Sequence, residues 1–213
     1  RQMCIRDRIS TYQDNMPLAA ELKADFEWAK SIAGGPGLSM NVAAAEITRC
    51  VLERDDKVRI LDADALNIIA GEHIDYKGSR EGQIIITPHI MEMSRLTGKT
   101  VADIKEHMIE SAKEYAIQHS CICILKDART VVTDGQKVYI NCTGNDGMST
   151  GGCGDVLTGL IAGMTAMGLD AFEAACLSVY VHGKAGDYAA SGKGRAGMTA
   201  ADISEAIAYV LKR

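Results

Sequence analysis

Short apolar runs alternate with longer stretches of helical periodicity along most of the chain. Apolar runs typical of buried strands occur at 29–37, 58–64, 83–88 and 121–126. Stretches with apolar residues at helical spacing follow each of the first three runs and lead into the fourth, at 40–54, 65–72, 89–98 and 101–119. Strands that alternate with helices in this way predict an α/β domain with a mostly parallel sheet.

The second half of the chain has a different pattern. Two short apolar runs flank Asp134-Gly135 within residues 130–141, which predicts a β-hairpin. Three helical stretches follow, at 153–168, 170–191 and 199–212. No repeat or low-complexity linker interrupts the pattern, so we expect one domain over residues 1–213. The opening run RQMCIRDR (1–8) has no clear period, and we expect it to lie outside that domain.

Polar or glycine-rich sequences end four of the predicted strands: GGPG, DAD, TPH and LKDART. In an open parallel sheet, ligands bind beyond the carboxyl ends of the strands. The pattern therefore predicts a ligand site at this edge of the sheet.

Composition narrows the range of partners. The chain has 213 residues, 47% apolar and 24% charged, with a net charge of −5, which argues against a nucleic-acid partner. No apolar run approaches 18 residues, so we expect no membrane partner. The seven cysteines form no CxxC pair, which indicates a reduced, cytoplasmic protein without structural zinc.

The stretch GMSTGGCGDVLTGLIAG (147–163) carries the strongest chemical signal. Gly151, Gly152 and Gly154 precede a helical stretch, so backbone N–H groups and the positive end of the helix dipole would point at one place. This arrangement suits a phosphoryl group in transfer, and Asp155 in the first turn would act as a base. The alternative is a tight turn whose acid only complements the dipole.

Five segments together resemble a known family. NCTGNDGMSTGGCGDVLTGLIAGMTAMG resembles the signature of the ADP/ATP-dependent NAD(P)H-hydrate dehydratases, the carbohydrate-kinase-like half of the YjeF family. GGPGL, LDADALN, TPHIMEMSRLTG and LKDART are similar to family motifs in the same order, and the resemblance covers about residues 29–207. It implies a three-layer ribokinase-like fold with a mostly parallel central sheet flanked by helices.

The resemblance also implies a reaction. Family members are hydro-lyases that repair hydrated NADH or NADPH (NADHX, NADPHX): ADP or ATP phosphorylates the ring hydroxyl, and phosphate then leaves. Mg²⁺ is expected with the nucleotide. A homo-oligomer and an upstream NAD(P)HX epimerase domain are expected as well.

Site residues follow by position in the motifs. Asp155 would contact the hydrated ring as the base, and Gly152 and Gly154 would form the anion hole. Gly37 and His89 would contact the hydrated dinucleotide. The ADP/AMP site would be formed by Lys126, Asp127, Ala128, Arg129, Thr130, Gly154 and Asn145. No metal ligand is assigned on the protein.

The sequence departs from the family pattern at four positions: Ser39, Met91, Asp127 and Cys153. The family's opening βαβ segment, with its glycine-rich loop, has no match before residue 29. We therefore expect an N-terminally incomplete domain that is less stable than a full one, with loss of activity as an alternative outcome.

Two other functions fit the same motifs. One is a small-molecule kinase of the hydroxymethylpyrimidine or hydroxyethylthiazole type, and the other is an inactive nucleotide-binding fragment. TPHIMEMSRLTG and GNDGMSTGG resemble the dehydratases more closely than these kinases.

Several single residues also have two interpretations. Asp62 and Asp64 fit an acid/base pair, but a strand-end acid and an N-cap for the helix at 65–72 is favoured. Cys153 suggests a reactive thiol as a minor hypothesis. Structural roles are expected for His182 and, as core residues, Met91, Met93, Met164 and Met167. Solvated side chains are expected for His73, His107 and His119.

Overall fold

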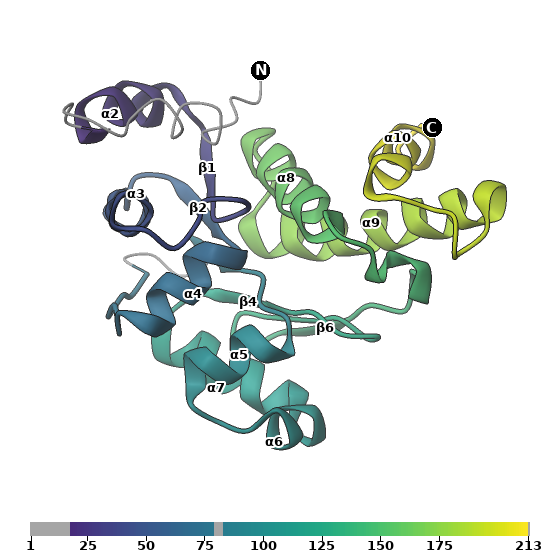
Figure 1. The fold of residues 1–213 in the computed structure, drawn as a ribbon, viewed down its shortest axis with the longest axis horizontal. Coiled ribbons are helices and arrows are strands. Elements are labelled where there is room, and N and C mark those ends of the chain that lie inside the picture. Colours follow the sequence, from purple (N-terminus) through teal and green to yellow (C-terminus); the bar gives the residue numbers. More distant parts are fainter. Residues whose placement is uncertain (1–17, 79–82, 213) are drawn as a thin grey trace.

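A six-stranded sheet forms the centre of the molecule (Figure 1). The computed structural model describes residues 18–78 and 83–212, so residues 1–8 lie outside the described part. The strands lie in chain order: β1 (Ser31–Gly34), β2 (Val58–Leu61), β3 (Ile84–Ile86), β4 (Ile122–Leu125), β5 (Val131–Thr133) and β6 (Val138–Ile140). The first four are parallel, and β5 and β6 pair antiparallel as the predicted hairpin.

Helices cover both faces of this sheet (Figure 1). One face carries α3 (Val42–Leu52), α4 (Ala63–Gly71), α5 (Ile90–Thr97), α6 (Val101–Glu106) and α7 (Met108–His119). The other carries α8 (Cys153–Ala166) and α9 (Ala171–Lys193), with α10 (Ala200–Val210) packed against them. These are the three layers of the predicted α/β fold.

Side-chain alternation along the strands divides the core between the two faces. Ile84 and Ile86 pack with the α3–α7 layer, whereas Ile85 between them packs with α8 and α9. All three are fully buried, because a strand covered by helices on both faces has no solvent-facing side. A continuous apolar run such as QIIITP is the result.

The structure differs from the predicted elements in two places. The predicted helix at 101–119 is two helices, because His107 leaves helical geometry with φ −126° and ψ 49°. The change of direction lets Ile104 and Tyr115, on different helices, both reach the core. In addition, α2 (Leu18–Trp28), which was not predicted, packs Leu22 and Phe26 onto the same face.

Some predictions for single residues were wrong as well. Met93 and Met164 are in the core, but Met91 and Met167 are exposed. His119 is half-buried and stacks on Tyr76 and Tyr115, so it is not simply solvated. His73 and His107 are exposed as expected.

Candidate active site

The carboxyl ends of the parallel strands bring the predicted motifs together. Asp62 follows β2, and His89 and Lys126 follow β3 and β4. The backbone N–H of Lys126 donates to the Pro88 carbonyl at 2.8 Å, and His89 and Lys126 form a parallel bridge beyond the strands. The start of α8 closes the same edge, because a Cβ on Gly154 would lie 3.4 Å from the Lys126 Nζ.

Asp62 is the most connected side chain at this edge. It is about 99% buried, its Oδ1 accepts from the Lys126 Nζ at 2.7 Å, and its Oδ2 accepts from the Thr158 hydroxyl at 2.8 Å. Asp62 follows β2 and occupies the N-cap position of α4, as predicted, but its side chain makes no capping bond to that helix. Its partners lie on β4 and α8 instead.

The charge of Asp62 is stabilised by these partners. Burial alone would raise the pKa of the carboxyl, but the Lys126 ammonium and the hydroxyls of Thr87 and Thr158 outweigh it and lower the pKa below 3.8. Asp62 is thus an anion at neutral pH, but its lowered pKa makes it a weak proton acceptor and both of its oxygens already accept hydrogen bonds, so the arrangement argues against a role as general base.

The glycine loop has the backbone that the sequence required. Gly152 is the N-cap of α8 with φ +88°, a conformation that favours glycine. A Cβ on Gly154 would also lie 3.5 Å from the Asp62 Oδ2, so the first turn of α8 rests directly on the Asp62–Lys126 pair. Asp155, in that first turn, is exposed.

Cys153 does not support a reactive thiol. Its side chain is buried, and burial together with the nearby Asp155 charge raises the pKa of the thiol despite a backbone hydrogen bond at Thr150. A raised pKa reduces the thiolate fraction at neutral pH. Burial and the raised pKa both argue against the minor hypothesis of a reactive thiol.

A short loop between β6 and α8 is fixed to α9 by one carboxylate. The Asp187 oxygens accept from the Gly144 N–H and the Asn145 Nδ2, both at 3.1 Å. Asn145 in turn caps the 3₁₀ helix η1 (Asp146–Ser149) by accepting from the Gly147 N–H. The predicted nucleotide contact Asn145 therefore has its amide oriented by Asp187.

His89 has a definite structural role. Its Nδ1 accepts from the backbone N–H groups of Met91 and Glu92, and the Glu92 carboxylate accepts from the His89 N–H, forming a capping box at α5. The ring is about half exposed at the strand edge. Because Nδ1 accepts, the ring proton is on Nε2, which lies 3.4 Å from the Glu92 Oε1.

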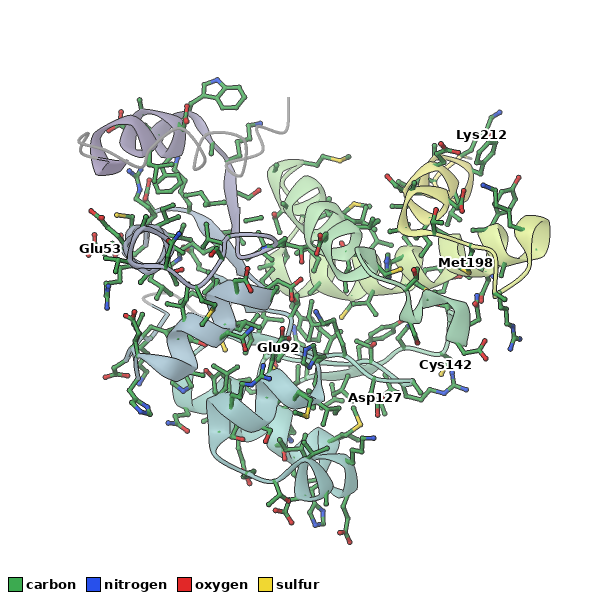
Figure 2. The ribbon with its side chains drawn as sticks, viewed as in Figure 1. Glu53, Glu92, Asp127, Cys142, Met198 and Lys212 are labelled. Carbon is green, nitrogen blue, oxygen red and sulfur yellow. The ribbon has the colours of Figure 1, made fainter. Side chains whose placement is uncertain are left out.

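The remaining predicted residues lie on exposed loops. Gly37, with φ +64°, follows β1, and Ser39 next to it donates its N–H to Asp64 at 2.8 Å. Asp127, Ala128 and Arg129 are exposed, and Asp127 is labelled in Figure 2. Lys126 differs from these neighbours, since its side chain is only 21% exposed and pairs with Asp62.

Three residues at this edge were not predicted as site residues. Thr158 bonds Asp62, Asp187 accepts from the predicted Asn145, and His182 is buried close to Cys153 and Lys126. Spacing offered one signal: Thr158 lies one helical turn after Asp155. Nothing in the sequence connects Asp187 to Gly144, 43 positions away.

These features define an α/β protein whose sheet edge carries a glycine-started helix, an exposed acid and a buried Lys–Asp pair. The family model for NAD(P)H-hydrate dehydratase matches residues 6–209, and the chain belongs to this family. The resemblance proposed from the motifs is thereby confirmed.

Relatives and solved structures agree. The chain is 45% identical over 183 residues to the bifunctional NAD(P)H-hydrate repair enzyme Nnr of Moorella thermoacetica, covering 85% of the chain and 34% of that protein. It is 35% identical to the ADP-dependent (S)-NAD(P)H-hydrate dehydratase of Neisseria meningitidis, covering 84% and 62%. The Bacillus subtilis ADP/ATP-dependent NAD(P)H-hydrate dehydratase co-crystallised with ATP/Mg²⁺ matches with a TM-score of 0.76 at 33% identity, covering 85% and 63%.

The chain spans about a third of the length of the bifunctional relatives that it matches. A hydroxyethylthiazole kinase from Pyrococcus horikoshii shares the fold with a TM-score of 0.69, at 14% identity. That likeness concerns the fold alone. Within residues 18–78 and 83–212, no helix is long and apolar enough to cross a membrane.

Proposed function

We propose that this chain dehydrates NADHX or NADPHX at the expense of ADP or ATP. The observation that carries the proposal is the start of α8: Gly152 and Gly154 bring its first turn, with no side chain at either position, to the sheet edge, and Asp155 is exposed beside them. Family membership supplies the substrate class. The motifs supply the positions of the residues.

The proposed reaction has two steps. The ring hydroxyl oxygen attacks the terminal phosphorus of the nucleotide, its proton goes to Asp155, and the bond to the leaving nucleotide oxygen breaks. The ring C–O bond then breaks, phosphate leaves with that oxygen, and the neighbouring carbon loses a proton to restore the double bond. N–H groups at the α8 terminus stabilise the negative charge of the phosphoryl oxygens during transfer.

The other predicted residues position the two ligands in this proposal. Gly37 and His89 contact the hydrated dinucleotide, for which the half-exposed His89 ring is accessible. The exposed residues at 127–129, together with the half-buried Thr130 and Asn145, contact the nucleotide.

Mg²⁺ would enter with the nucleotide, since the Bacillus subtilis dehydratase was co-crystallised with ATP and Mg²⁺ together. It usually binds one or two carboxylates together with substrate phosphates, and it neutralises phosphate charge during transfer. Asp146, exposed on the loop before α8, is the side chain that we propose as a ligand. No group of three or more His, Cys, Asp or Glu side chains suited to an ion occurs among the described residues.

The setting of the chain is part of the proposal. Relatives named bifunctional support a second activity in longer proteins, which we take to be NAD(P)HX epimerisation. A homo-oligomer and a cytoplasmic location are proposed with it. Six cysteines in the described residues are free, which fits a reducing compartment.

Absorbance at 340 nm tests the function directly. With hydrated NADH, Mg²⁺ and ADP or ATP, the wild-type chain is expected to restore absorbance, and Asp155→Asn to lower the rate by about 100-fold or more. Asp103→Asn is the matched control, because Asp103 is also an exposed acid in the first turn of a helix, α6, away from the site.

Three results are distinguishable. Recovery that Asp155→Asn abolishes and Asp103→Asn keeps supports the dehydratase and its base together. A phosphorylated product that accumulates without recovery indicates the small-molecule kinase. Nucleotide binding with neither product indicates the inactive fragment.

A further inference from the structure

We propose that Lys126 contacts the transferred terminal phosphoryl group, and that Asp62 and Thr158 are positioning residues that hold its ammonium beneath the start of α8. The inference rests on the proposed function and deepens it. It changes the expectation for Lys126, which the motif placed with its neighbours in the ADP/AMP site. It also gives Asp62 a role other than acid, base or metal ligand.

The first argument is the direction of the side chain. Asp127, Ala128 and Arg129 are exposed, but the Lys126 Nζ is 2.7 Å from the Asp62 Oδ1. The ammonium therefore points away from the exposed loop and toward Asp62 at the end of β2.

The second argument is what lies directly above the ammonium. A Cβ on Gly154 would be 3.4 Å from the Lys126 Nζ, so this cation touches the first turn of α8. The positive end of the α8 helix dipole lies at the same place. A cation there adds to the helix field, and only an anion, such as a phosphoryl group, benefits from both.

The third argument is the way that Asp62 is held. Its two oxygens accept from Lys126 on β4 and from Thr158 on α8, and the group is almost completely buried. A buried charge pair of this kind is weak evidence for stability, because desolvation offsets its attraction. The pair does hold the flexible Lys126 side chain in one position, while an ammonium has three N–H donors and can still bind a second acceptor.

ATP and AMP separate this role from the one implied by the motif. A lysine on the terminal phosphoryl group affects ATP and not AMP, whereas a lysine in the AMP site affects both. We expect Lys126→Met to weaken ATP binding by about 10- to 100-fold, the range for a charge-assisted hydrogen bond, and to leave AMP binding within about twofold. Calorimetric titration of each nucleotide with Mg²⁺ gives both constants.

Asp62 and Thr158 are tested through the same ratio. Asp62→Asn releases Lys126, and we expect it to lower the ATP-to-AMP affinity ratio by about 10-fold. Thr158→Val is expected to lower it less. Thr165→Val is the matched control: Thr165 is also buried on α8, but it donates to helix carbonyls, so its ratio stays at the wild-type value.

A double variant covers the case in which a single change prevents folding. Asp62→Asn with Lys126→Met removes both charges, so no unpaired charge is left buried in the fold. We expect it to melt near the wild-type temperature and still lose the preference for ATP.

The results decide between the roles. Equal losses of ATP and AMP in Lys126→Met, or an unchanged ratio in the folded double variant, overturn the inference and leave the dehydratase proposal standing. A wild-type chain that binds neither nucleotide overturns both. A wild-type chain that binds ATP and restores no absorbance overturns the dehydratase alone.

Discussion

His182 is a buried imidazole beneath the first turn of α8. Burial lowers its pKa to about 4, and the Lys126 charge adds to this against a hydrogen bond with the Cys153 backbone. A histidine that is harder to protonate in the fold stabilises the protein fully above its unfolded pKa, about 6.5. We expect the free energy of unfolding to fall by about 3 kcal/mol as the pH drops from 6.5 to 4.

Urea unfolding at several pH values measures this slope. His182→Asn cannot titrate, so its slope over the same window is expected to be flatter. The carboxyl of Asp62 contributes below this range, because its pKa is lowered from 3.8. Parallel slopes for the variant and the wild type would remove His182 as the cause.

Asp187 gives a second prediction at this scale. It accepts from Gly144 and Asn145, and we expect Asp187→Ala to weaken ADP binding by about 10-fold because the Asn145 amide loses its orientation. Asp134→Ala is the control: Asp134 also accepts two hydrogen bonds, both from backbone N–H groups, in the β-hairpin away from the site. Titration calorimetry that shows the same loss in both variants would contradict a local role for Asp187.

Single residues were predictable where the motif itself is local. Gly152, Gly154 and Asp155 are neighbours in sequence and in space, so spacing was enough to place them at a helix start. Asp62 was placed correctly before the helix, but its side-chain bonds could not be predicted because its partners lie 64 and 96 positions later. The helix start nearby indicated a capping bond. Nothing in the local sequence indicates that Lys126 and Thr158 bind the carboxylate instead.

Among the elements, α9 has a glycine where a loop packs closely against it. A Cβ on Gly183 would overlap Thr143, so the loop before η1 lies against the helix backbone there. We expect Gly183→Ala to lower the free energy of unfolding by about 1–3 kcal/mol, because the loop must move.

Gly192→Ala on the same helix is the matched control. No atom lies within 4 Å of the Cβ that it would add, and alanine favours helix, so this change is expected to stabilise by about 0.5–1 kcal/mol. Thermal melting of the two variants shows whether each change raises or lowers the stability. A neutral Gly183→Ala would mean that the loop yields without cost.

Periodicity predicted most elements because strands buried on both faces read as apolar runs and the helices between them are amphipathic. It missed the break at His107, since apolar residues continue at helical spacing through both α6 and α7. The division into two helices depends on how Ile104 and Tyr115 reach one core. That is a property of packing and cannot be read from local spacing.

At the scale of the whole molecule, composition and element order were enough to predict the class of fold. They could not predict which helices share a face. The order β1 to β6 places α3 to α7 together and leaves α8 to α10 on the opposite side (Figure 1). The site depends on that arrangement, because α8 approaches the strand ends from the face opposite α5.

Thiol labelling tests this architecture through cysteines spread across it. Cys142 is exposed after β6, whereas Cys121 and Cys123 are buried where β4 crosses the core. Burial raises the pKa of Cys121 to about 12 and that of Cys123 well above 9, so few thiolates form even when a reagent approaches. In a Cys4→Ser chain, we expect Cys142 to react within minutes at neutral pH.

Cys121 and Cys123 should then react only at the rate of global unfolding, because the central strands of a sheet open last. Peptide mass spectrometry after timed labelling assigns each site, and added urea should accelerate both cysteines together. Rapid labelling of either one in native buffer would contradict a β4 covered on both faces. Because Lys126 directly follows β4, such opening would also release the ammonium from Asp62, so protection at Cys123 and the preference for ATP should be lost together.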